Sequence, residues 1–218
     1  MSMRTASALA AAVLVAVVAV ALALAYGGSD RPHSRLRTVF IGDSITWADS
    51  TSPGTRPGPG SWVRYAVEDP RSPWELAANV AVSGQTLGQM DARFQRDVLA
   101  RHPEAVVIMG GTNDLLTGAP RGLGELALRH MVDDAHAAGV PVWIIGLPPI
   151  DQASPSSLAT MATMEQAVAR ATGATYVPVG EGLATPTGDW RRGLSFDGVH
   201  PTPAGARALA DAVLARLG

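Results

Sequence analysis

Short apolar runs alternate with amphipathic segments along the chain from about residue 36 to the end. Each run is bounded by glycine, proline or polar clusters, as the buried strands of a parallel sheet are. The predicted strands cover residues 39–41, 76–82, 105–109, 140–147 and 175–179. Repeated strand–helix units with short connections imply one parallel sheet that is covered on both faces. The pattern therefore predicts an α/β fold with three layers.

Amphipathic helices are expected between these runs. In residues 86–101, apolar side chains recur at spacings that place them along one stripe of a helix, namely Leu87, Met90, Phe94 and Val98. Further helices are predicted over residues 122–138, 156–172 and 203–217, the last with proline in its first turn. Such stripes belong to the core of a domain, so we do not interpret them as binding surfaces.

The N-terminal segment departs from this alternation. Residues 8–26 carry no charge, and their length lies between the roughly 7–15 apolar residues of a cleaved signal and the about 20 of a membrane span. The pattern predicts a signal peptide or an N-terminal membrane anchor over residues 1–26, a linker over 27–36 and a single domain over 37–218. Either alternative implies an extracytoplasmic domain, secreted or anchored to the outer face of the cytoplasmic membrane.

Composition removes several kinds of chemistry at once. The 218 residues include no cysteine, and all 17 basic residues are arginine. Thiol nucleophiles, disulfides, cysteine-bound zinc, Schiff-base lysines and the lysine of a phosphate-binding loop are thereby excluded. The formal net charge is −2 and there is no basic cluster, so we expect no nucleic-acid partner.

Candidate catalytic residues stand after the predicted strands. Ser44 follows the first strand, Gly84 the second and Asn113 the third. Asp197 and His200 stand near the C-terminus. Because ligands of this fold class bind outside the carboxyl ends of the strands, we expect all five residues at one edge of the sheet. A serine becomes a nucleophile beside an imidazole that a carboxylate holds, and N–H groups and an Asn amide stabilise the oxyanion of acyl transfer.

Each of these residues also has an ordinary structural interpretation. Ser44 alone suits the N-cap of a helix, and Asn113 alone suits a turn or a cap. Asp197, which precedes a glycine, alone suits a turn. The functional interpretation therefore depends on the whole set and on its order along the chain.

The set resembles the SGNH, or GDSL-type, serine hydrolases over essentially all of residues 37–217. Four stretches carry the resemblance in the family's order: GDSIT, the second glycine-containing block NVAVSGQT, GGTND and DGVHPTPAG. The first stretch has Ile45 where many members of the family have leucine. The resemblance implies a flavodoxin-like α/β/α sandwich with a central parallel sheet, and neither a metal nor another cofactor.

The resemblance also implies a role for each candidate residue. It makes Ser44 the nucleophile, His200 the base and Asp197 the residue that orients His200. The oxyanion hole would consist of the N–H groups of Ser44 and Gly84 and the side chain of Asn113.

The family includes esterases, lysophospholipases, thioesterases, carbohydrate acetylesterases and some acyltransferases, so the resemblance leaves the substrate open. We expect a monomeric serine esterase that acts through an acyl-serine on extracytoplasmic O-acylated glycans or lipid esters, with the membrane as a partner if the N-terminal segment stays uncleaved. The alternatives are an O-acyltransferase with the same triad, a lysophospholipase or thioesterase, and, least favoured, a non-catalytic binding domain. Trp47 is a candidate substrate-loop residue, although a tryptophan there equally suits packing.

Overall fold

Five parallel strands form the sheet of the computed structural model, which describes residues 35–48 and 57–217. The strands are β1 (Leu36–Gly42), β2 (Trp74–Asn79), β3 (Ala105–Met109), β4 (Val142–Ile145) and β5 (Thr175–Val177). They lie in the order β2-β1-β3-β4-β5, and each neighbouring pair is parallel. This is the flavodoxin-like order, which confirms the predicted fold class. The carboxyl ends of all the strands consequently meet at one edge of the sheet.

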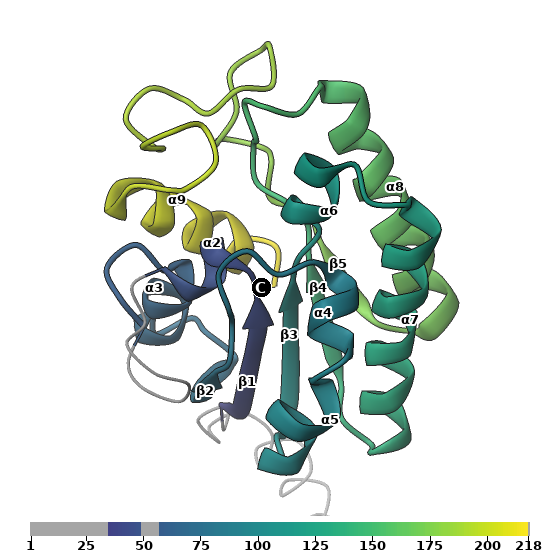
Figure 1. Cartoon of the computed structure of the whole chain (residues 1–218). Coiled ribbons are helices and arrows are strands. Elements are labelled where there is room, and N and C mark those ends of the chain that lie inside the picture. The colour runs from purple at the N-terminus through teal and green to yellow at the C-terminus, as the bar shows by residue number, and fades with distance from the viewer. Residues whose placement is uncertain (1–34, 49–56, 218) are drawn as a thin grey trace, which may run out of the picture. The chain divides into compact units, whose positions relative to one another are not determined.

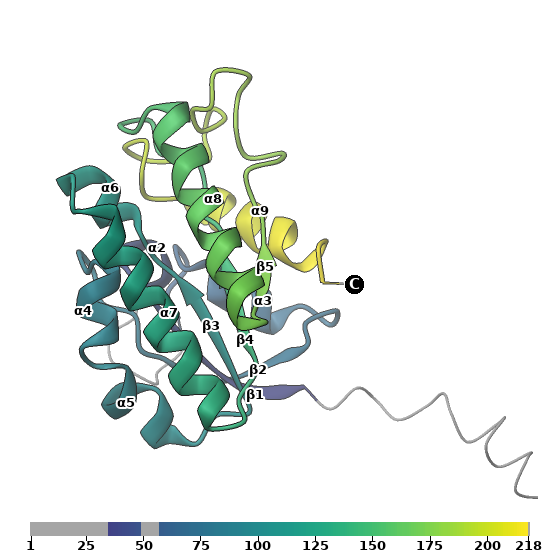
Figure 2. The same ribbon diagram turned by 90° about the vertical axis from the view of Figure 1, so that its right-hand side faces the viewer.

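Helices cover both faces of the sheet (Figures 1 and 2). One face carries α3 (Trp62–Glu68) and α9 (Pro203–Leu214). The other face carries α4 (Leu87–Asp91), α5 (Phe94–Asp97), α7 (Arg121–Ala137) and α8 (Pro155–Thr172). The remaining short helices are α2 (Ser44–Trp47), the 3-10 helix η1 (Leu99–Arg101) and α6 (Thr112–Thr117). Of these, α2 and α6 begin at the carboxyl edge.

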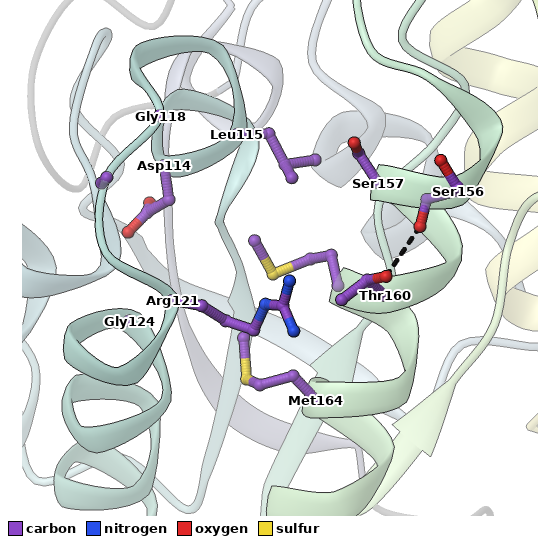
Figure 3. A pocket seen from close by; sticks show the side chains of 11 residues that line it. Asp114, Leu115, Gly118, Arg121, Gly124, Ser156, Ser157, Thr160 and Met164 are labelled. Atoms are coloured by element: carbon purple, nitrogen blue, oxygen red, sulfur yellow. Dashed lines mark hydrogen bonds between the residues drawn. The ribbon is translucent and has the colours of Figure 1, made fainter.

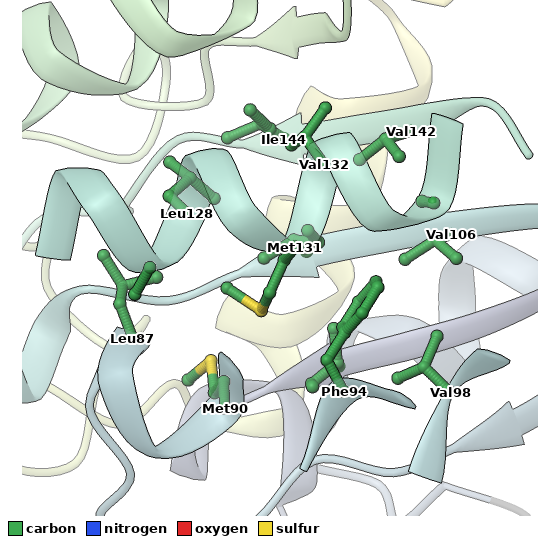
Figure 4. Packing of buried hydrophobic residues seen from close by; sticks show 14 of the residues in the cluster. Leu87, Met90, Phe94, Val98, Val106, Leu128, Met131, Val132, Val142 and Ile144 are labelled. Atoms are coloured by element: carbon green, nitrogen blue, oxygen red, sulfur yellow. The ribbon is translucent and has the colours of Figure 1, made fainter. Parts of the chain in front are cut away.

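The two-residue period of the strands divides the core between the two faces. In β1, Val39 and Ile41 belong to the hydrophobic cluster under α4, α7 and α8, part of which Figure 4 shows. Phe40 belongs to the opposite cluster, where its ring meets Trp62 and Trp74 edge-on at centroid distances of 5.8 and 5.7 Å. Continuous apolar strands are required because both faces are buried, which is why these runs were recognisable in the sequence.

The single helix predicted over residues 86–101 is wrong, because the segment divides into α4, α5 and η1. At the first break, Arg93 has φ −120° and ψ 1°. Arg93 is only 7% exposed, and its guanidinium donates hydrogen bonds to the Val80 carbonyl and to the Gln85 side chain, both at 2.7 Å. The apolar stripe still faces the core, so its periodicity did not reveal the break.

The predicted leader over residues 1–26, and residues 27–34 of the predicted linker, lie outside the described residues. From Arg35 onward the chain forms one compact unit, and β1 begins at Leu36. Among the helices that the structure describes, none combines the length and the apolar character needed to cross a membrane.

Candidate active site

Ser44 stands at the start of α2, directly after the first strand of the chain. The N-cap of α2 is Asp43, whose Oδ1 accepts a hydrogen bond from the Ile45 N–H at 3.0 Å. Capping is thus done by the neighbouring aspartate, and the Ser44 hydroxyl makes a different contact. Its Oγ lies 2.9 Å from Nε2 of His200. The alternative interpretation of Ser44 as the cap is wrong.

The short helix that carries Ser44 is held at its far end as well. The carbonyl of Thr46 accepts hydrogen bonds from Nδ2 of Asn79 at 2.8 Å and from Oγ of Ser61 at 2.7 Å. Carbonyls at a helix end have no partner within the helix, so these side chains supply the missing donors. The serine turn is therefore fixed from β2 and from the segment before α3.

His200 and Asp197 come together at the same edge of the sheet. Nδ1 of His200 lies 2.7 Å from Oδ2 of Asp197. The other carboxylate oxygen, Oδ1, accepts the backbone N–H groups of His200 at 2.8 Å and Val199 at 3.0 Å. Partial burial raises the pKa of Asp197, but these hydrogen bonds outweigh it and lower the pKa to about 2. The carboxylate is therefore ionised at neutral pH and can orient the imidazole.

Gly84 and Asn113 lie close together across the loop that follows β2. Gly84 has φ +79°, a left-handed conformation that glycine adopts without strain. Nδ2 of Asn113 donates a hydrogen bond to the carbonyl of the next residue, Gln85, at 2.9 Å. An amide nitrogen carries two hydrogens, so this contact orients the group and leaves a second donor.

Two residues that the sequence analysis did not select hold the Gly84 loop in place. Oδ2 of Asp114 accepts the backbone N–H of Leu87 at 3.0 Å, where the loop ends and α4 begins. The buried Arg93 binds the loop through Val80 and the Gln85 side chain, as described above. Periodicity cannot identify such contacts, because they join residues that only the fold brings together.

Asp43 is a buried carboxyl beside the candidate nucleophile. Burial raises its pKa to about 6, although the hydrogen bond from Ile45 and the proximity of Thr112 and His200 oppose that rise. Its Oδ2 is buried without a hydrogen-bond partner among the described residues. The aspartate of the Gly-Asp-Ser turn is thus a fully buried cap of α2.

A hollow of about 250 Å³ contains the candidate nucleophile and base. Its lining includes Ser44, His200, Trp47 and the residues Ser83 and Phe196. The structure therefore places the candidate substrate-loop residue Trp47 at the site. Within the described chain, no group of three or more histidine, aspartate or glutamate side chains is arranged to hold a metal ion.

A second hollow of about 310 Å³ lies between α6, the start of α7, and α8 (Figure 3). Arg121 and Met164 project into it, and the hydroxyl of Thr160 donates to the Ser156 carbonyl at 2.8 Å on its α8 side. Neither Ser44 nor His200 lines it. The hollow at Ser44 and His200 is thus separate from this second hollow and smaller than it.

Three solved structures similar to this chain share its fold. A G-D-S-L family protein from Desulfitobacterium hafniense DCB-2 is 19% identical, with a TM-score of 0.70 over 82% of this chain and 98% of that one. An acetylxylan esterase from Geobacillus stearothermophilus is 23% identical, with a TM-score of 0.68 over 84% and 94%. A GDSL-like lipase from Bacteroides thetaiotaomicron VPI-5482 is 23% identical, with a TM-score of 0.63 over 83% and 85%.

Comparison with family models extends this likeness from fold to family. The curated proteins contain no significant match to the chain. The model of the GDSL-like lipase/acylhydrolase family, in contrast, matches residues 40–208. That range runs from β1 into α9 and includes Ser44 and His200. The chain therefore belongs to the GDSL-like lipase/acylhydrolase family and is a serine hydrolase of carboxylic esters.

Proposed function

We propose that Ser44 is the nucleophile of this ester hydrolase, His200 its general base and Asp197 the residue that orients His200. The observation that carries the proposal is the chain of contacts from Ser44 Oγ to His200 Nε2 at 2.9 Å and from His200 Nδ1 to Asp197 Oδ2 at 2.7 Å. A base within hydrogen-bond reach of a hydroxyl, itself held by a carboxylate, is the arrangement that activates serine.

The reaction proceeds in two halves. Ser44 Oγ attacks the ester carbonyl while His200 Nε2 takes its proton, and the tetrahedral intermediate collapses as His200 gives that proton to the leaving alcohol. An acyl group then remains on Ser44. His200 then removes a proton from a water molecule, which attacks the acyl carbon. The carboxylic acid leaves, and His200 returns the proton to Ser44 Oγ.

The oxyanion of each tetrahedral intermediate binds to three donors. Two are the backbone N–H groups of Ser44 and Gly84, and the third is the amide of Asn113. Ser44 is the first residue of α2, where N–H groups have no acceptor within the helix. The contact between Asn113 and the Gln85 carbonyl supports this role, because it orients the amide beside the Gly84 loop.

A parallel in the acetylxylan esterase from Geobacillus stearothermophilus supports the assignment of the triad. Variants of a serine, an aspartate and a histidine of that enzyme are described as catalytic mutants. Its aspartate precedes its histidine by three positions. Asp197 and His200 have the same spacing here.

The proposed substrates are O-acylated glycans or lipid esters outside the cytoplasm. The location rests on the apolar segment of residues 8–26, whose sequence suits a signal peptide or an anchor. The open hollow at Ser44 supports an ester whose alcohol reaches the surface of the domain.

Hydrolysis of a p-nitrophenyl ester series, from acetate to palmitate, tests the proposal with the full chain and its Ser44→Ala variant. We expect turnover that disappears in the variant, and labelling of Ser44 by a serine-directed phosphonate, located by mass spectrometry. Turnover that persists in the variant, or labelling of another serine, would refute the assignment of the nucleophile.

A further inference from the structure

An exposed aromatic ring stands beside the candidate triad. Large hydrophobic side chains are mostly buried in this domain, and the most exposed one in the described part of the chain is Phe196, at 73%. Phe196 directly precedes Asp197 and lines the same hollow as Ser44 and His200. Keeping an aromatic ring in water is unfavourable, so an exposed ring at this place suggests a binding role.

The backbone around Phe196 is held by hydrogen bonds. The Phe196 N–H donates to the carbonyl of His200 at 3.0 Å, and the same carbonyl accepts Oγ of Ser195 at 2.8 Å. The Gly198 N–H donates to Ser195 Oγ at 2.9 Å. These bonds close the segment into a small loop with Phe196 and Asp197 inside it. The ring is thus presented by the same ordered turn that positions the imidazole.

A second aromatic ring lines the hollow from another element. Trp47 lies in α2, one helical turn after Ser44, and is 36% exposed. The ester site is therefore bordered by one ring from the nucleophile helix and one from the loop of the base. Ser83 lines the same hollow and adds a hydroxyl group.

The size of the hollow favours a single ring over a long chain. Its volume of about 250 Å³ lies below the roughly 300–1,000 Å³ of sites for drug-sized ligands. The larger apolar hollow, of about 360 Å³ and bordered by Pro148, Leu158 and Val179, does not include Ser44. A sugar ring has apolar C–H faces that stack on aromatic rings and hydroxyl groups at its edge that pair with a residue such as Ser83.

We propose that Phe196 and Trp47 bind the sugar ring of an O-acetylated glycan and so determine the alcohol that this hydrolase accepts. This inference rests on the proposed role of Ser44 as nucleophile. The two rings act on the alcohol part of the ester, and the small hollow leaves room for a short acyl group at Ser44.

The test compares two acetate esters that differ in their alcohol: a mono-O-acetylated methyl glucopyranoside and ethyl acetate. For Phe196→Ala we expect the ratio of kcat/KM, glycoside over ethyl acetate, to fall about tenfold through a higher KM for the glycoside. Phe196→Trp should restore the ratio. The matched control is Leu123→Ala, another exposed apolar residue, on α7 and outside the hollow, which should leave both rates unchanged.

An unchanged ratio in Phe196→Ala would overturn the inference, whether both values of kcat/KM stay the same or fall by the same factor. A selective loss on octanoate esters in phosphatidylcholine vesicles, with the glycoside unaffected, would overturn it in favour of a lipid surface. The proposed function is tested separately, and it fails if the Ser44→Ala variant hydrolyses ethyl acetate as fast as the unmodified chain does.

Discussion

Two carboxyl groups flank the candidate nucleophile, and their surroundings are opposite. Asp43, in the turn between β1 and α2, is fully buried, and burial raises its pKa to about 6. Asp197, in the loop before α9, has a side chain that is 53% exposed, and hydrogen bonds that outweigh its partial burial lower its pKa to about 2. Burial makes the ionisation of Asp43 less favourable, whereas hydrogen bonds make the ionisation of Asp197 more favourable.

The difference separates a structural carboxyl, Asp43, from one with a proposed catalytic role, Asp197. Asp43 caps α2 through a single backbone N–H, a contact that a neutral group can also make. In the proposed mechanism Asp197 holds a positively charged imidazole during each proton transfer, and a charge near water carries little desolvation cost. The buried side of the site therefore fixes geometry, whereas the exposed side supplies charge.

Replacing each of the two aspartates by asparagine should give the largest difference in kcat. Asp197→Asn should lower kcat roughly 10⁴-fold, because the neutral amide no longer stabilises the imidazolium or its tautomer. Asp43→Asn should stay within about tenfold of the unmodified chain at pH 7, since Asn also caps a helix. Steady-state kinetics measure both, with circular dichroism to confirm folding. Equal losses in the two folded variants would remove the distinction.

Asn113 extends the comparison to a third segment, the start of α6. Asn113→Ala should lower kcat by roughly 100- to 1,000-fold, because one donor to the oxyanion is lost. The variant should retain its fold, since its contact with the Gln85 carbonyl is one of several that hold the loop. Single-turnover kinetics check the chemical step. A folded variant with full activity would make Asn113 a turn residue only.

The raised pKa of Asp43 predicts how the free energy of unfolding depends on pH. Below about pH 4 the carboxyl is protonated in both the folded and the unfolded chain, so it does not change the free energy of unfolding as the pH changes. Between about pH 4 and 6 the unfolded chain releases its proton first, so the free energy of unfolding falls as the pH rises, by up to about 3 kcal/mol in all.

Urea denaturation of the unmodified chain and Asp43→Asn at pH 4 and pH 7 measures this contribution as a difference. The stability of the variant relative to the unmodified chain should rise between the two pH values, because Asn cannot ionise. A difference that is independent of pH would show that the carboxyl titrates normally.

Backbone crowding on the buried side gives the smallest expected effect. A Cβ on Gly42 would lie 2.6 Å from the Met109 carbonyl and would also collide with Thr46, so Gly42→Ala should cost about 1–3 kcal/mol. The matched control is Gly122→Ala in α7, where nothing lies within 4 Å and alanine favours the helix by about 0.5–1 kcal/mol. Urea denaturation measures both, and a neutral Gly42→Ala would contradict the close approach.

Sequence alone predicted a strand at each of the five places because each contains a short apolar run, most clearly Ala105–Met109, whose residues are all buried. The edge strands β2 and β5 also carry exposed residues, Glu75 and Thr175. The candidate residues of the site could be selected because the Gly-Asp-Ser turn and the Asp-Gly-Val-His stretch are local patterns in a family order, and the structure brings Ser44, Asp197 and His200 together. The helix α6 was missed because Asn113 and Asp114 are typical of turns. Arg93 was missed because its partners, Val80 and Gln85, belong to a different segment.

The exposure of Phe196 also lay beyond prediction from sequence. An isolated phenylalanine between polar residues gives no periodic signal, and hydrophobicity alone would place it in the core. Its position depends on the hydrogen bonds that close the loop around Ser195 and His200, which only the folded chain reveals.

The hydrogen bond between Ser44 and His200 joins residues that are 156 positions apart. The proposed nucleophile and its proposed base therefore meet only when β1 and the loop before α9 fold into the same domain. A fragment that contains only one of these two segments holds half of the proposed site, and we expect it not to cleave esters.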